Sequence, residues 1–115
     1  MSCMKEKDIQ ILSKILTYID DIALFSSGMG SESFMQDKKT TSACAFGIMQ
    51  IGELAKELSD DIQNQNPTLP WKGIRGMRNR IAHDYKNVDY TILWDTVQTS
   101  LPELKEQLTE LLKTM

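Results

Sequence analysis

Apolar residues recur every three or four positions in four stretches of the chain, the spacing that places them on one face of an α-helix. These stretches predict helices over Lys5–Phe25, over Thr40–Leu58, over about Trp71–His83, and after Asp89, which can cap the last helix. The predicted core positions are Ile9, Leu12, Ile15, Leu16, Ile19, Ile22, Ala23, Cys44, Ile48, Ile51, Ala55, Leu58, Ile74, Met77, Ile81, Val97, Leu101, Leu104, Leu108 and Leu111.

The connections between these stretches are short and polar. Ser31–Phe34 is expected to form a turn before the second helix begins near Asp37. Ser59–Asp61 either extends the second helix or caps a further turn. Pro70 can lead into the third helix, because proline is tolerated around a first turn. Pro102 falls inside the last apolar stripe, where its ring and missing N–H predict a kink or a break.

No stretch alternates between apolar and polar residues as a β-strand does, and no internal repeat is present. The sequence therefore predicts an all-α fold, an antiparallel up-and-down bundle of four main helices in a single domain over residues 1–115. A chain of 115 residues can bury a core without disulfides. It leaves little room for a deep cavity in one subunit, so an elaborate active site would need a partner chain.

The two cysteines and the single histidine make neither a disulfide framework nor an ordinary structural zinc site, and we expect no bound metal. A reducing cytoplasm is the expected location. Asp20 and Asp21 interrupt the first apolar segment, and no stretch has the length of a membrane span. We therefore expect a protein that is neither exported nor embedded in a membrane.

The net charge of −3 argues against a protein that coats nucleic acid with a general positive field. The segment from Trp71 to Lys86 differs from this average, because it holds five basic residues and one acidic residue. An acidic body with one basic segment indicates a focused anion site.

Four residues of the third predicted helix share one polar face. Lys72, Gly76, Asn79 and His83 fall within roughly 60° of one another at 100° per residue, opposite the predicted core edge. Gly76 costs about 1 kcal/mol of helix stability relative to alanine, which fits a close approach by a ligand or another helix. The face can therefore present an imidazole to a ligand.

Structural roles explain the same residues without a ligand. His83 can be a dipole partner or a cap at a helix C-terminus. Arg75, Arg78 and Arg80 can be solvated or paired with the acidic body. Tyr85 continues the apolar edge if the helix persists, which favours core packing.

Two motifs carry a resemblance to a known family. Arg78, His83 and Tyr85 have the spacing R-x-x-x-x-H-x-Y, and residues 48–56, IMQIGELAK, match I-x-x-I-G-E-x-A-K. Further matches are Pro70-Trp71, Gly76-Met77-Arg78-Asn79, Trp94 and Leu101-Pro102-Glu103-Leu104. On these residues the chain resembles the HepT-like branch of HEPN domains, the toxin partners of minimal nucleotidyltransferase (MNT) antitoxins.

The resemblance implies a bundle of four or five helices that forms a homodimer, with two copies of the motif facing a shared cleft. It implies a metal-independent endoribonuclease without a cofactor. In that chemistry His83 moves protons and Arg78 neutralises charge on the phosphoryl oxygens. Asn79 would orient the imidazole or the phosphate, and Lys72, Arg75 and Arg80 would contact or orient the RNA.

Tyr85 has a separate role under the same resemblance. In similar toxins the motif tyrosine accepts AMP groups from the MNT-type nucleotidyltransferase. The added negative charge would repel RNA from the cleft. This role requires an accessible hydroxyl group, in conflict with the core interpretation of Tyr85.

Two other functions fit parts of the pattern. A non-catalytic HEPN module could use the same basic cleft to bind a nucleotide or to serve as a scaffold for the nucleotidyltransferase. A plain helical dimerisation protein would explain the apolar stripes, but it would not explain the cluster of Arg78, Asn79, His83 and Tyr85.

Overall fold

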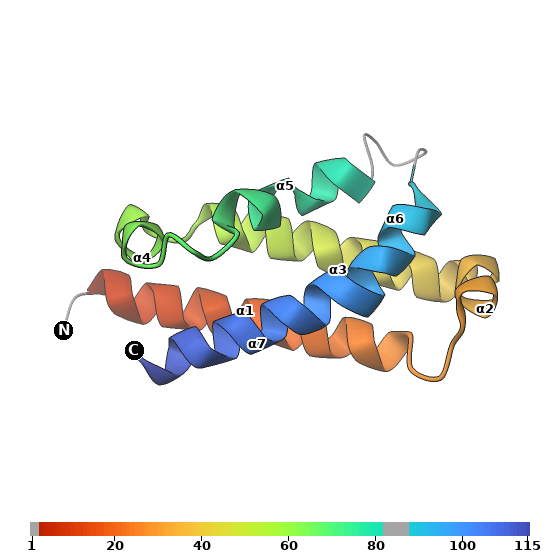
Figure 1. Ribbon diagram of the computed structural model, residues 1–115, viewed down its shortest axis with the longest axis horizontal. Coiled ribbons are helices and arrows are strands. Elements are labelled where there is room, and N and C mark those ends of the chain that lie inside the picture. Colours follow the sequence, from red (N-terminus) through yellow and green to blue (C-terminus); the bar gives the residue numbers. More distant parts are fainter. Residues whose placement is uncertain (1–2, 82–87) are drawn as a thin grey trace.

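The protein consists of helices that lie side by side along one long axis (Figure 1). The structure is a computed structural model that describes residues 3–81 and 88–115. Successive long helices run in opposite directions (Figure 1). The long helices are α1 (Cys3–Phe25), α3 (Lys38–Lys56), α5 (Trp71–Ile81) and α7 (Leu101–Lys113). Between them in sequence come α2 (Ser31–Gln36), α4 (Asp60–Gln65), α6 (Tyr90–Asp95) and the π-helical segment η1 (Thr96–Ser100).

The described residues contain no β-strand, which confirms the all-α class. The number of helices differs from the four or five expected, because α2, α4 and α6 are separate short helices. Ser31–Phe34, expected as a turn, belongs to α2. Phe34 is fully buried there, with its ring centroid 4.9 Å from that of Trp94. Short helices depend on such tertiary packing, which a local apolar pattern does not reveal.

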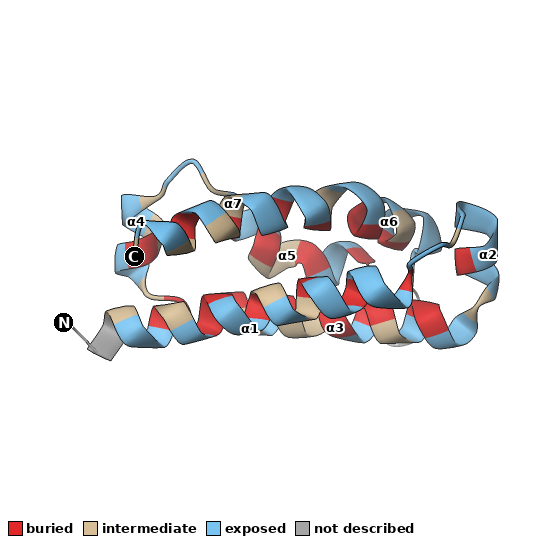
Figure 2. Cartoon of the chain, turned by 90° about the horizontal axis from the view of Figure 1, so that it is seen from below, coloured by how far each residue is buried: buried red, intermediate tan, exposed pale blue. Residues whose placement is uncertain are grey.

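The core lies between the long helices, and their buried residues face inward (Figure 2). The predicted core positions of α3, α5 and α7 are all buried, together with Leu58 and Val97. The prediction for α1 is partly wrong, since Ile11 is buried whereas Ala23 is exposed and Ile9 and Leu16 are half-buried. The reason is that α1 packs against both α3 and α7, which moves the centre of its buried face. None of the described helices is both long and apolar enough to cross a lipid bilayer.

A buried carboxylate joins α1 to the start of α4. Asp8 accepts hydrogen bonds from the backbone N–H of Ser59 at 2.9 Å and from its hydroxyl group. The Ser59 Oγ atom in turn accepts from the N–H of Ile62 at 3.2 Å, which makes Ser59 the N-cap of α4. Ser59–Asp61 therefore does not extend the preceding helix but caps and begins a new one, which is one of the two predicted alternatives.

The predicted disturbance at Pro102 takes the form of a π-helical turn. The backbone N–H of Leu101 donates to the carbonyl of Thr96, five residues earlier, at the end of η1. Pro102 then occupies the first turn of α7, where the widened π-helical turn accommodates its ring and its missing N–H. The wider turn admits the proline, so α6, η1 and α7 follow one another without a connecting loop.

Candidate active site

Helix α5 carries the described residues of the candidate site, and one buried edge fixes its position. Trp71, Ile74, Met77 and Ile81 are buried, which confirms the core edge predicted for this helix. The indole N–H of Trp71 also donates a hydrogen bond to the carbonyl of Asn66 at 2.8 Å. These contacts set the rotation of α5, so its remaining faces are determined as well.

Gly52 lies where α3 and α5 come closest to each other. A Cβ atom on Gly52 would be 3.5 Å from the carbonyl oxygen of Arg75 and 3.9 Å from the Cβ atom of Arg78. A longer side chain would run into the backbone of α5. The glycine of the I-G-E-x-A-K segment therefore allows α5 to pack closely on α3, and Arg78 then stands beside α3.

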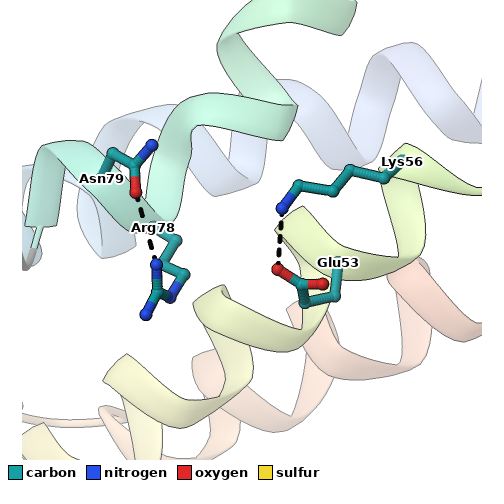
Figure 3. A network of polar contacts seen from close by, with 4 residues as sticks. All are labelled: Glu53, Lys56, Arg78 and Asn79. Atoms are coloured by element: carbon teal, nitrogen blue, oxygen red, sulfur yellow. Dashed lines mark hydrogen bonds and ion pairs between the residues drawn. The ribbon is translucent and has the colours of Figure 1, made fainter. Parts of the chain in front are cut away.

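Arg78 and Asn79 are exposed neighbours at this boundary (Figure 3). Arg78 Nη1 lies 3.5 Å from Asn79 Oδ1, at the long limit of hydrogen bonding. On α3, next to Gly52, the exposed Lys56 Nζ and Glu53 Oε1 form an ion pair of 3.0 Å (Figure 3). A guanidinium has five donors, and the described residues leave most of those of Arg78 without an acceptor, so they can bind an anion.

Arg75 is engaged inside the fold. Its side chain is half-buried, and its Nη1 atom donates a hydrogen bond to Oε1 of Gln63 on α4. The amide nitrogen of Gln63 donates in turn to the carbonyl oxygens of Leu58 at 3.2 Å and Ser59 at 3.3 Å. These contacts favour the structural interpretation of Arg75, as a link between α4 and α5.

The other predicted cations lie on different sides of α5. Lys72 and Arg80 are exposed, and Arg80 lines a groove between α5 and α7 together with Glu103. Gly76 has no neighbour within 4 Å of where its Cβ atom would be, so packing within the described chain does not require a glycine there. The structure thus brings Arg78 and Asn79 together and separates Arg80 from them.

His83 and Tyr85 lie outside the described residues, so their predicted roles stay predictions. The described residues on either side are joined, because the N–H of Asp89 donates to the carbonyl of Ile81 at 2.7 Å. The Asp89 carboxylate also accepts from the N–H groups of Thr91 and Ile92, each at 3.1 Å. The predicted cap of the last helix is therefore confirmed, on α6.

The described residues offer no metal cluster, and the thiol of Cys44 is not reactive. Among residues 3–81 and 88–115, no group of three or more His, Cys, Asp or Glu residues is placed to hold a metal ion. Cys44 is buried in α3, and burial raises the pKa of its thiol to about 11. The thiol is protonated at neutral pH and is a poor nucleophile.

Sequence reasoning did not anticipate the ion pair of Glu53 and Lys56 on α3, next to the glycine that faces Arg78. Both belong to the I-G-E-x-A-K segment, and their spacing of three residues is a signal for an ion pair on a helix surface. Their position beside α5 follows from the contact at Gly52, which no local pattern reveals.

The chain is similar to one ribonuclease family and to several named relatives. A family model described as "Ribonuclease HepT-like" matches residues 15–111. A Methanocaldococcus jannaschii protein named "Putative RNase MJ0125" is 35% identical over 111 residues, which are 96% of each chain. A Thermococcus cleftensis protein named "Probable ribonuclease HepT" is 34% identical over 110 residues, 96% of this chain and 100% of that protein. No solved structure matches the chain.

Proposed function

The chain belongs to the family of HepT-like ribonucleases, and from this premise we propose that it is an endoribonuclease that works without a metal. The observation that carries the proposal is the exposed guanidinium of Arg78, which lies near the end of α5 and five residues before His83. A planar guanidinium with open donors is suited to bind the phosphate of an RNA backbone.

The proposed reaction is a phosphoryl transfer within the RNA. The ribose 2′-oxygen attacks the adjacent phosphorus, the 5′-oxygen of the next nucleotide leaves, and a 2′,3′-cyclic phosphate remains. His83 takes the proton of the 2′-hydroxyl or gives one to the leaving oxygen. Arg78 neutralises the charge that develops on the phosphoryl oxygens, and Asn79 orients the phosphate or the imidazole.

A homodimer would bring these groups into one cleft. On an ideal helix, Arg78 and His83 point about 140° apart, so one copy of the motif does not converge easily on a single phosphate. We propose that two subunits place their motifs on opposite sides of a shared cleft. Arg78 of one subunit would then act with His83 of the other.

The biological role we propose is that of the toxin in a cytoplasmic HEPN/MNT toxin–antitoxin module of type VII. The partner would be an MNT-type nucleotidyltransferase that transfers AMP to the hydroxyl group of Tyr85. The attached AMP adds negative charge next to the proposed phosphate site and would repel the RNA substrate.

A non-catalytic role is the alternative. The module would bind a nucleotide, or serve as a scaffold for the nucleotidyltransferase, through the same basic surface. The exposed position of Arg78 and Asn79 suits recognition of a phosphate as well as catalysis, so cleavage itself has to be measured.

The test is cleavage of a mixed RNA substrate in EDTA by the wild-type protein and by His83→Ala, with analysis of the product ends. We expect cyclic phosphate ends from the wild type and their loss in the variant. Lys39→Ala, which removes an exposed cation at the start of α3, is the control and should cleave normally. Absence of cleavage by folded, unmodified wild type on several RNAs would refute the enzyme and favour the non-catalytic module.

A further inference from the structure

An open groove of about 320 Å³ runs between α5 and α7, on a different side of α5 from Arg78. Its floor is apolar and consists of Ile74, Met77 and Leu104, which are buried residues of the core. Along α5 it extends from Pro70 to Arg80, about 15 Å at 1.5 Å per residue. The groove is therefore a hollow with an apolar base beside the helix of the candidate site.

Gly73 keeps this groove open. The residue lines the groove, and a Cβ atom there would meet a single neighbour, the Cβ atom of Pro70, at 3.8 Å. Alanine would fit, and it would stabilise the helix by about 1 kcal/mol relative to glycine. No contact inside the described chain therefore demands a glycine, whereas a larger side chain would fill the groove.

The rim of the groove is polar and unpaired. Arg80, Ser100, Glu103 and Gln107 line it, and their side chains form no hydrogen bond or ion pair with any described residue. They offer a cation, a carboxylate and two groups that both donate and accept hydrogen bonds. An apolar floor with a few such polar groups is the usual composition of a small-ligand site, and the volume is at the lower end of the rough range of 300–1,000 Å³ for such sites.

The charge of α5 indicates the class of ligand. This helix carries four basic residues and no acidic one, and Arg80 on the groove lies two residues after Arg78. A strand of RNA whose phosphate is bound at Arg78 would have further phosphates within reach of Arg80. The groove is too small for a helix of a second protein, which is about 10 Å wide.

We propose that this groove binds one nucleobase of a single-stranded RNA, away from the phosphate that is cleaved. The base would lie on the apolar floor with its edge towards Glu103 and Gln107, while Arg80 holds the neighbouring phosphate. A carboxylate accepts hydrogen bonds but donates none, so Glu103 favours a base with an exocyclic amino group, such as cytosine, over uracil. The proposal rests on the proposed RNA substrate but does not require that the RNA is cleaved.

The first test measures binding of short, fluorescently labelled single-stranded RNAs by anisotropy, without a cleavage step. Gly73→Leu fills the groove on an exposed helix surface and keeps the base out of it. We expect about tenfold weaker binding, because the base then loses one or two hydrogen bonds and its apolar contact with the floor. Thr109→Leu, a similar change on α7 outside the groove, should bind as the wild type does. Unchanged binding by folded Gly73→Leu would overturn the proposal.

The second test measures base preference. Wild-type protein should bind oligocytidine about tenfold more tightly than oligouridine, and Glu103→Gln should lose most of this difference because its amide also donates. Equal preference in the two proteins would overturn the proposal. If Gly73→Leu no longer forms a dimer but still binds RNA, the proposal is also overturned. The groove would then be a contact between copies of the chain.

Cleavage assays separate this proposal from the proposed function. If the wild type binds RNA without cleaving it and Gly73→Leu binds it more weakly, the result would refute the nuclease but support the groove as a binding site. RNA that is cleaved by both proteins with the same KM would support the nuclease but refute the groove.

Discussion

Gly52 of α3 faces Arg78 of α5 so closely that a methyl group on Gly52 would touch the Arg78 side chain. A Cβ atom on Gly52 would lie 3.9 Å from that of Arg78 and 3.5 Å from the carbonyl oxygen of Arg75. These are ordinary contact distances, so the site has room for a methyl group but for nothing larger. The position of the proposed catalytic arginine therefore depends on a residue of another helix.

Two substitutions of Gly52 should behave differently. Gly52→Ala should leave cleavage unchanged and should stabilise α3 by up to about 1 kcal/mol, because alanine is the better helix former. Gly52→Leu should push α5 away, cost about 1–3 kcal/mol of unfolding free energy and reduce RNA cleavage more than tenfold. Urea denaturation and RNA cleavage are the measurements. Equal activity of the two variants would show that the packing of α5 does not position Arg78.

Arg75 and Arg78 should separate stability from activity. Arg78→Ala should abolish most RNA cleavage and change the unfolding free energy by less than about 0.5 kcal/mol, since its side chain is exposed. Arg75→Ala should cost about 1 kcal/mol of stability through the lost hydrogen bond to Gln63. Gln63→Ala should be destabilised to a similar extent. The prediction is wrong if Arg75→Ala weakens RNA binding while its stability is that of the wild type.

Gly47 and Gly76 differ in the space around them. A Cβ atom on Gly47 would lie 2.8 Å from Cδ1 and 2.9 Å from Cγ1 of the buried Ile22, so Gly47→Ala should destabilise the protein by about 1–3 kcal/mol. Gly76→Ala meets no neighbour within 4 Å and should stabilise the protein by up to about 1 kcal/mol. Thermal unfolding of both variants is the check, and melting temperatures shifted in the same direction would contradict it.

The buried carboxylate of Asp8 should be important for stability. Asp8→Ala removes two hydrogen bonds and leaves the N–H of Ser59 without this acceptor, so we expect a loss of about 2 kcal/mol in urea denaturation. The control is Asp20→Ala, which breaks the exposed ion pair with Lys105 and should cost less than about 1 kcal/mol. Similar losses of unfolding free energy in the two variants would show that the buried Asp8 contributes no more to stability than an exposed ion pair does.

The buried thiol of Cys44 should react slowly with reagents while the protein is folded. The free energy of unfolding should also depend on this thiol at alkaline pH. Burial raises the pKa of this thiol to about 11, so the folded state holds the proton more tightly than the unfolded chain. The resulting stability is complete below the ordinary thiol pKa and falls as the pH rises towards 11. In a Cys3→Ser background, the remaining thiol should react with a disulfide reagent slowly in buffer and rapidly in urea. Rapid reaction in buffer would contradict the buried position.

The long helices could be predicted because each follows from a local apolar period. The core edge of α5 and the cap at Asp89 were also read correctly, since both depend on residues close together in sequence. Helices α2 and α4 and the π-helical turn before Pro102 were not predicted in this form. They depend on distant partners, such as the ring of Trp94 for Phe34 and the carboxylate of Asp8 for Ser59.

The candidate site shows the same division. The sequence alone identified the basic helix, the residues of its motif and, through them, the family, because these are matters of residue type and spacing. It gave Arg78 a catalytic role and assigned Arg75 and Arg80 to binding or orienting the RNA. Only the tertiary structure separated them, since Gln63 holds Arg75, α3 flanks Arg78 and the groove beside α7 receives Arg80. The physical reason is that a helix pattern gives the angles between side chains, whereas the partners on each side are set by contacts between residues far apart in the chain.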